Sequence, residues 1–137
     1  MEISQIKITP DPYGQYRISH GHRVGDMLFI SGQTAMDDDG QLVGIGSFDD
    51  QANKTFENLE KILIAGGSSL KNVVKLTIML QDIGNLPKVI ALKERYFIKP
   101  YPAETLFEIS SLFSPDAMIE IEAIAVVNIA ADWVERK

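Results

Sequence analysis

Two glutamates alternate with apolar residues near the C-terminal end of the sequence. Glu120 and Glu122 share one face of an expected strand over residues 119–127, and that face continues in apolar side chains. The opposite face carries Ile119, Ile121, Ala123 and Ala125. A strand with two apolar faces is covered on both sides, and carboxylates at the edge of a covered face are either paired or functional. For Glu122 we expect a structural ion pair, with Lys75 as the candidate partner.

Other residues with chemical potential are less specific. His20 and His22 have the period-two spacing of one strand face, which can hold a metal, but no third ligand is placed and hairpin side chains are the favoured interpretation. Ser31 has no histidine or acid at a nucleophile's spacing. The loop 37–40 lacks the rest of a calcium-loop pattern, and residues 66–69 follow a helix end, where no phosphate loop forms. We therefore predict no metal site.

Composition restricts the class of protein. The chain has 137 residues, 45% of them hydrophobic and 23% charged, which is ordinary for one globular domain, here residues 1–137. It has no cysteine, no signal-peptide pattern and no apolar stretch of membrane-spanning length. We expect a cytoplasmic protein without membrane association. A net charge of −6 argues against nucleic-acid binding, which requires Lys and Arg against phosphates.

Periodicity predicts an α+β fold. The clearest helix covers residues 48–65, where apolar side chains recur at helical spacing between a Ser47–Asp50 capping box and a glycine pair. A second helix begins near Pro87, with Val89, Leu92, Tyr96 and Phe97 on its core face. Strands are expected at 6–9, 16–19, 27–31, 73–80, 103–109 and 119–127, with a tight turn at 24–26 joining the second and third into a hairpin.

These elements predict one mixed sheet with both helices packed on one face. Its other face is then bare, although several strands carry apolar residues in both registers. A large exposed apolar face is typical of an oligomer interface.

Several segments, in order and spacing, resemble the RidA/YjgF family of trimeric enamine/imine deaminases. The resemblance covers roughly residues 17–127, and it is carried by these segments: Val24–Gln33, Gln51–Leu63 with Glu57-Asn58-Leu59, Gly66–Leu70, Val73–Lys75, Tyr96-Phe97, Pro102-Ala103 and Ile119–Ala125. It implies a chorismate-mutase-like fold, a homotrimer with small-molecule clefts between subunits, and no metal or cofactor. It also implies hydrolysis of reactive enamines and imines to keto acids and ammonia.

The resemblance assigns roles to individual residues. It implies that Glu120 positions or activates the attacking water and that Ser31 and Gly32 hold ligand. Three positions depart from the family pattern: Glu104 stands where an arginine clamps the substrate carboxylate, Ile18 where a tyrosine lines the pocket, and Ile90 where an asparagine does. Leu106, two residues beyond Glu104, is a further candidate for substrate binding. His20, close to Ile18, is an open candidate for a cleft role.

Two functions follow from this pattern. The first is a deaminase with altered specificity, because Glu104 repels a substrate carboxylate where an arginine fork would bind it. The second is a non-catalytic trimer that binds small molecules in the same clefts. A third activity, ribonuclease, is attached to some relatives by name, but the acidic charge counts against it. If Glu104 and Glu120 share one cleft, one of the two carboxylates holds its proton to a higher pH than a free glutamate.

Overall fold

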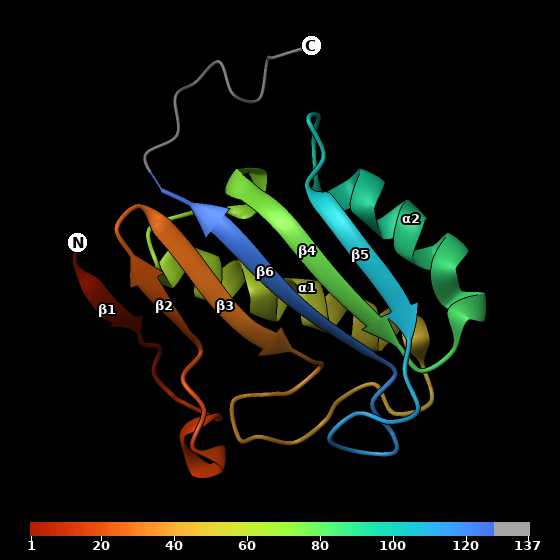
Figure 1. Ribbon diagram of the computed structural model, residues 1–137. Helices are drawn as coiled ribbons and strands as arrows, with labels where there is room; N and C mark the ends of the chain where they lie inside the picture. The colour runs from red at the N-terminus through yellow and green to blue at the C-terminus, as the bar shows by residue number, and fades with distance from the viewer. Residues whose placement is uncertain (128–137) are drawn as a thin grey trace.

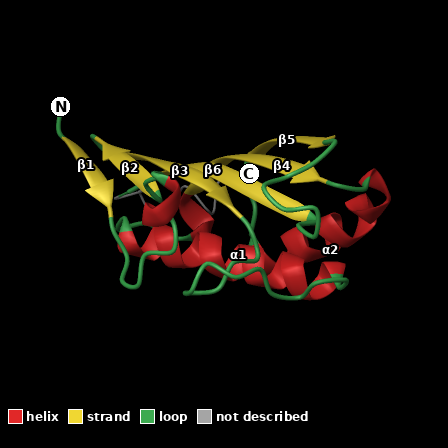
Figure 2. Cartoon of the chain, turned by 90° about the horizontal axis from the view of Figure 1, so that it is seen from below, coloured by secondary structure: helices red, strands yellow, loops and turns green. Residues whose placement is uncertain are grey.

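The fold is a six-stranded mixed sheet with two helices on one face (Figures 1 and 2). The computed structural model describes residues 1–127. Its strands and helices are β1 (Ile3–Ile6), β2 (Gly21–Val24), β3 (Met27–Gln33), α1 (Phe48–Ala65), β4 (Val73–Leu80), α2 (Leu86–Tyr96), β5 (Ala103–Glu108) and β6 (Ile119–Val126). The strand order is β1-β2-β3-β6-β4-β5, and only β4 and β5 run parallel. The predicted fold class is confirmed.

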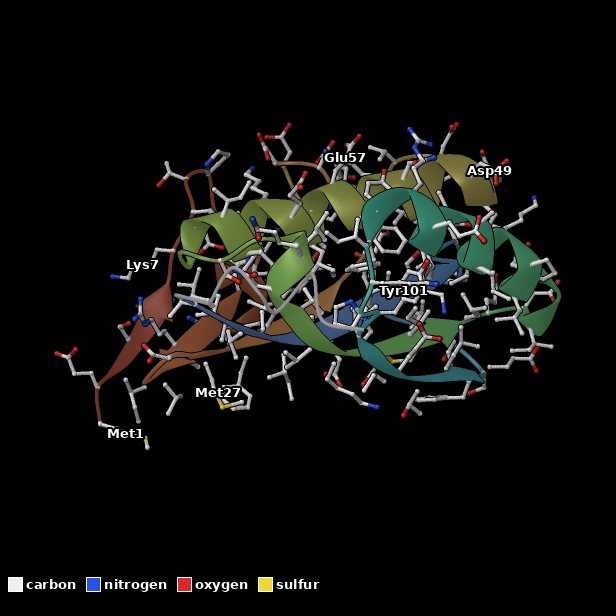
Figure 3. The ribbon with its side chains drawn as sticks, turned by 90° about the horizontal axis from the view of Figure 1, so that it is seen from above. Met1, Lys7, Met27, Asp49, Glu57 and Tyr101 are labelled. Carbon is white, nitrogen blue, oxygen red and sulfur yellow. The ribbon has the colours of Figure 1, made fainter. Side chains whose placement is uncertain are left out.

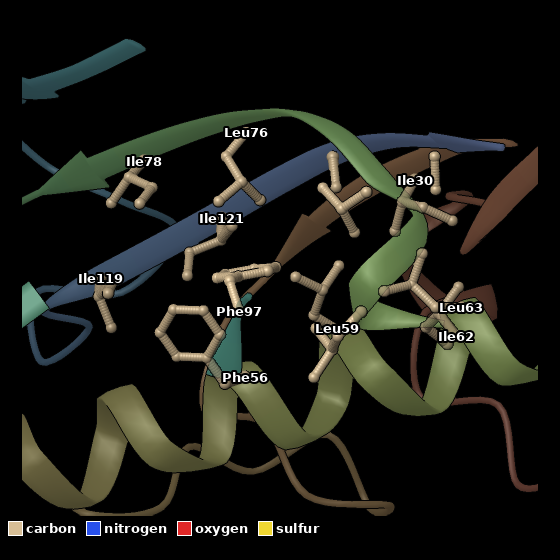
Figure 4. Close-up of a cluster of buried hydrophobic side chains, with 14 of the residues drawn as sticks. Ile30, Phe56, Leu59, Ile62, Leu63, Leu76, Ile78, Phe97, Ile119 and Ile121 are labelled. Carbon is tan, nitrogen blue, oxygen red and sulfur yellow. The ribbon is translucent and has the colours of Figure 1, made fainter. Parts of the chain in front are cut away.

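The core lies between the sheet and α1 (Figure 4). Phe56, Leu59 and Leu63, spaced along one face of α1, are fully buried against strand residues such as Leu76 and Ile121. Ser47 caps α1, since its side chain accepts a hydrogen bond from the backbone N–H of Asp50 at 3.2 Å. Helix α1 therefore has the bounds and the cap that the sequence predicts.

The N-terminal strands differ from the prediction. Strand β1 ends at Ile6 instead of starting there, and the segment 16–19 is not a strand. The carboxylate of Asp11 accepts hydrogen bonds from the backbone N–H groups of Tyr13 and Gly14, which turns the chain into a short 3₁₀ helix at Gly14–Tyr16. Arg17 follows in the left-handed region, with φ of 62°. The hairpin turn at 24–26 is correct, but its first strand is β2.

The sheet face away from the helices carries a mixed surface. Met27 projects from this side, opposite Glu57 on the outer side of α1 (Figure 3). The strand registers place further apolar side chains on the same face, namely Phe29, Met79, Phe107, Ile124 and Val126. Phe29 and Phe107 are both 43% exposed. The predicted bare face is therefore present, but its apolar side chains are interspersed with polar ones such as Lys75, Thr77 and Glu122.

Candidate functional site

Glu120 lies beside a bulge in β3. The register between β3 and β6 shifts between Ile30 and Gln33, so two residues, Ser31 and Gly32, are accommodated where regular pairing would place one. A Cβ atom at Gly32 would fall on the carboxylate of Glu120. Only glycine therefore allows the Glu120 carboxylate to lie directly against the β3 backbone. The position of this carboxylate thus depends on the glycine in the bulge.

The charge of Glu120 is disfavoured by its surroundings. Partial burial raises the pKa of its carboxyl above the ordinary value of 4.5, and the like charge of Glu122, two residues along β6, raises it further. Within one chain the neighbouring acid is Glu122, so the expected coupling between Glu104 and Glu120 stays a prediction. Such a carboxylate is suited to accepting a proton and returning it.

Tyr13 is hydrogen-bonded to the backbone of the bulge. Its hydroxyl donates a hydrogen bond of 2.6 Å to the carbonyl of Gly32, and its ring stacks on His20 with 4.3 Å between ring centroids. The Nε2 atom of His20 lies 2.8 Å from a carboxylate oxygen of Asp11. Burial, and then the charge of Glu120, raise the pKa of the Tyr13 hydroxyl, so the phenol stays protonated and remains a donor. His20 therefore packs against Tyr13 and does not itself line the site.

These residues border a cavity of about 380 Å³, here called the Glu120 pocket. Its lining residues are Tyr13, Tyr16, Ile18, Ser31, Gly32, Thr34, Met36, Phe113 and Glu120. The buried hydroxyl of Thr34 has no hydrogen-bond partner within residues 1–127. The hydroxyl of Ser31 donates a hydrogen bond of 2.5 Å to the carbonyl of Ser19, so it joins β3 to the segment that precedes β2. No cationic side chain of the described residues lines this pocket.

Glu104 and Ile90 belong to a second cavity of about 240 Å³, here called the Lys93 pocket. Its lining residues are Ile90, Lys93, Glu94, Phe97, Tyr101, Pro102 and Glu104. Glu104 pairs in register with the core residue Leu76, so its side chain lies on the helix side of the sheet. There Lys93 of α2 donates to its carboxylate at 2.7 Å. Within one chain, Glu104 therefore shares a pocket with a lysine and not with Glu120.

The remaining predictions have mixed outcomes. Leu106 packs against the core and lines neither of these two pockets, so its role in ligand binding stays a prediction. The expected pair of Glu122 with Lys75 is wrong, since Lys75 instead donates to the hydroxyl of Thr105 at 2.7 Å. His20 is buried just before β2, whereas His22 is exposed within it. Residues 1–127 contain no cluster of three potential metal ligands.

Tyr13 and Lys93 are not among the site residues predicted from the sequence. Tyr13 lies in the turn-forming segment 10–14, where an aromatic residue gave the one available signal. Lys93 could have been found, because it follows Ile90 by three residues on a helix and so lies on the same side as Ile90.

Comparison with known proteins places the chain in a family. The family model described as Endoribonuclease L-PSP matches residues 7–127. A RutC family protein of Pyrococcus horikoshii is 38% identical over 124 residues, covering 90% of this chain and 96% of that protein. The human 2-iminobutanoate/2-iminopropanoate deaminase is 36% identical over 125 residues, covering 90% and 88%.

Solved structures agree with the sequence matches. RidA from the Antarctic bacterium Psychrobacter sp. superposes with a TM-score of 0.75 at 31% identity, covering 80% of this chain and 88% of that one. Yeast Mmf1 superposes with a TM-score of 0.84 at 26% identity, covering 93% and 100%. The six-stranded sheet, the order of its elements and these matches together show that the chain belongs to the RidA/YjgF family.

Proposed function

We propose that this protein is a hydrolytic deaminase of small imines or enamines, with Glu120 as the base that activates water. The observation that carries the proposal is the half-buried carboxylate of Glu120, with its raised pKa, held against the β3 bulge in the Glu120 pocket. The names of two relatives support the reaction class, since the human and Dermatophagoides farinae proteins are called 2-iminobutanoate/2-iminopropanoate deaminases.

The proposed reaction adds one water to a C=N bond. The substrate reacts as its iminium form, whose nitrogen already carries the extra proton. Glu120 accepts a proton from water as the water oxygen bonds to the iminium carbon, and the resulting neutral carbinolamine carries a hydroxyl and an amino group. The protonated Glu120 then gives this proton to the amino nitrogen, the C–N bond breaks, and the hydroxyl proton is released as the carbonyl forms. The products are ammonia and a carbonyl compound.

The substrate cleft forms between subunits in this proposal. Ile18, Ser31, Gly32 and Glu120 contribute from one subunit of a homotrimer, and Ile90, Glu104 and Leu106 contribute from its neighbour. The bare apolar sheet face supports such an assembly. Because Glu104 stands where the family has its arginine, we expect imino acids of the 2-aminoacrylate type to be poor substrates. A charge-assisted bond to a carboxylate contributes roughly 1.5–3 kcal/mol, so its loss costs about ten- to hundredfold in rate.

An ammonia-release assay tests this function. Imines without a carboxylate, generated in situ from primary amines by an amine oxidase, are supplied to the wild type and to Glu120→Gln, which keeps the shape of the side chain but removes the base. We expect turnover by the wild type and a loss of at least about a hundredfold in the variant. Equal rates in both proteins would exclude Glu120 as the base.

The alternative function is a non-catalytic small-molecule binder. The ion pair between Lys93 and Glu104 favours it, because among the described residues that line this pocket no cation is left unpaired to bind a substrate carboxylate. Saturable ligand binding without ammonia release from any imine tested would support this alternative.

A further inference from the structure

The ion pair between Lys93 and Glu104 differs from the other pairs of the described residues. The two side chains are 24% and 21% exposed, with 2.7 Å between Nζ and Oε1. The Lys88–Asp49 pair, which also involves a lysine of α2, has side chains 54% and 69% exposed and a separation of 3.8 Å. A short, half-buried pair is screened less by solvent than an exposed one, so its charges act more strongly on their surroundings.

This pair faces a cavity with apolar walls. Ile90, Phe97, Tyr101 and Pro102 form most of the lining, and Glu94 is exposed at its border. Tyr101 lies beside α2 in the side-chain view (Figure 3). A ligand in this cavity would meet aromatic and aliphatic surface together with one lysine whose charge is already balanced.

We propose that Glu104 serves as an internal carboxylate that occupies Lys93, so that the Lys93 pocket selects uncharged apolar or aromatic groups and rejects carboxylates. Lys93 is then a specificity-determining residue whose attraction for anions is masked. The inference rests on the function proposed above only in treating this pocket as part of the ligand site, and it concerns binding, not turnover.

The physical argument is a competition for one ammonium group. Lys93 has three donor hydrogens, and a ligand carboxylate that approached them would meet the negative charge of Glu104 at hydrogen-bond distance from the same nitrogen. Exposed Glu94 adds a second negative charge at the border. Neutralising Glu104 should therefore convert the pocket into an anion site without the addition of any cation.

Calorimetric titration with two probes of equal shape tests the proposal. Benzamide presents an uncharged amide and benzoate a carboxylate on the same ring, which suits the apolar walls. We expect the wild type to bind benzamide more tightly than benzoate. In Glu104→Gln, benzoate should bind about ten- to hundredfold more tightly than in the wild type, the range of a charge-assisted hydrogen bond.

Two further variants keep the test specific. Glu104→Gln combined with Lys93→Gln should lose the gained benzoate affinity, because the ammonium group is gone. Asp49→Asn makes the same change in net charge at the exposed pair and should leave benzoate affinity at the wild-type value. Methyl NMR shifts of Ile90 report whether binding occurs in this pocket.

The proposal is overturned if wild type and Glu104→Gln bind benzoate equally, or if the double variant keeps the gain. Absence of ammonia release in the deaminase assay, with these titrations behaving as expected, would reject the deaminase and leave the specificity inference intact.

Discussion

Glu120 is held at a place where its charge is unfavourable. Its carboxylate is half-buried, lies against Gly32 and has Glu122 as a near neighbour on β6. Tyr13 fixes the carbonyl of Gly32 by a hydrogen bond, so the backbone beneath the carboxylate cannot easily move away. Ionisable groups in such unfavourable surroundings concentrate at functional sites, because a shifted pKa is what proton transfer requires.

This placement predicts an effect on stability. The folded-state pKa of Glu120 lies above its ordinary value of 4.5, so the folded protein binds more protons between the two values and loses stability as the pH rises through that window. A glutamine has no such loss. We expect Glu120→Gln to raise the melting temperature at pH 7, with the gain shrinking as the pH falls toward 4.5.

Thermal unfolding of both proteins between pH 4 and pH 8 measures this effect. Glu57→Gln, at an exposed position on α1, is the matched control and should give a difference that does not depend on pH in this way (Figure 3). A melting-temperature difference for Glu120→Gln that stays constant across the range would contradict the buried-charge argument.

Glu122 predicts a second pH effect, on activity. Its negative charge raises the pKa of Glu120, so Glu122→Gln should lower that pKa. Because the general base must be ionised, the acidic limb of the kcat/KM profile should move to lower pH in this variant. The limb is measured by ammonia release at a series of pH values, and a shift in the other direction would be inconsistent with the assignment of Glu120.

The pairing of the strands and the turns between them determine which of these residues come into contact. The alternation of β6 was sufficient to predict the two faces of that strand and the position of Glu120. The bulge in β3 could not be predicted, because one extra residue against a partner strand leaves no periodic signal in a sequence. The segment 16–19 was assigned wrongly because the side-chain acceptor of Asp11 redirects the backbone, which hydrophobic patterning does not report.

The contacts in the Lys93 pocket also depend on how the elements pack. The family resemblance predicts that Glu104 points into the substrate cleft, and within one chain the structure pairs it with a lysine from α2. Strand β5 pairs with β4 and α2 precedes it in the chain, so the contact depends on how a helix packs beside an edge strand. Helical spacing puts Lys93 on the side of Ile90, but only the packing of α2 shows which strand residue it meets.

Among substitutions in the helices and strands, we expect the largest loss of stability from one in the core face of α1. Phe56 is fully buried, with its ring stacked on Tyr96 at 4.6 Å and in edge contact with Phe97 at 6.0 Å between centroids. Phe56→Ala removes these contacts and leaves a cavity between α1 and the sheet, at a cost of about 3–5 kcal/mol. Urea unfolding measures the loss. Ile64→Ala, at a position 63% exposed on the same helix, should cost far less.

At the scale of the whole molecule, we propose that the exposed sheet face associates with copies of this chain. Neither helix within residues 1–127 has the length and apolar character needed to span a membrane. The C-terminal segment 129–137 has no role that the sequence predicts, and it lies outside the described residues. The apolar side chains on the bare sheet face, among them Met27 and Phe29, are the surface that the proposed trimer would cover.

The trimer prediction can be tested at Phe29. This side chain is 43% exposed on the bare face and pairs across the sheet with Ile124, so a charge there would be buried in any assembly that covers the face. Light scattering of the wild type should give about three times the chain mass of 15.2 kDa, and Phe29→Glu should shift the mass toward one chain. Ile64→Glu, on the helix side, should leave the trimer intact.

Because the cleft is proposed to lie between subunits, Phe29→Glu should also lose ammonia release while its circular dichroism remains that of the folded chain. A wild-type monomer at all concentrations would reject the intersubunit cleft, and an active monomeric Phe29→Glu would place the whole catalytic site within the Glu120 pocket of one chain.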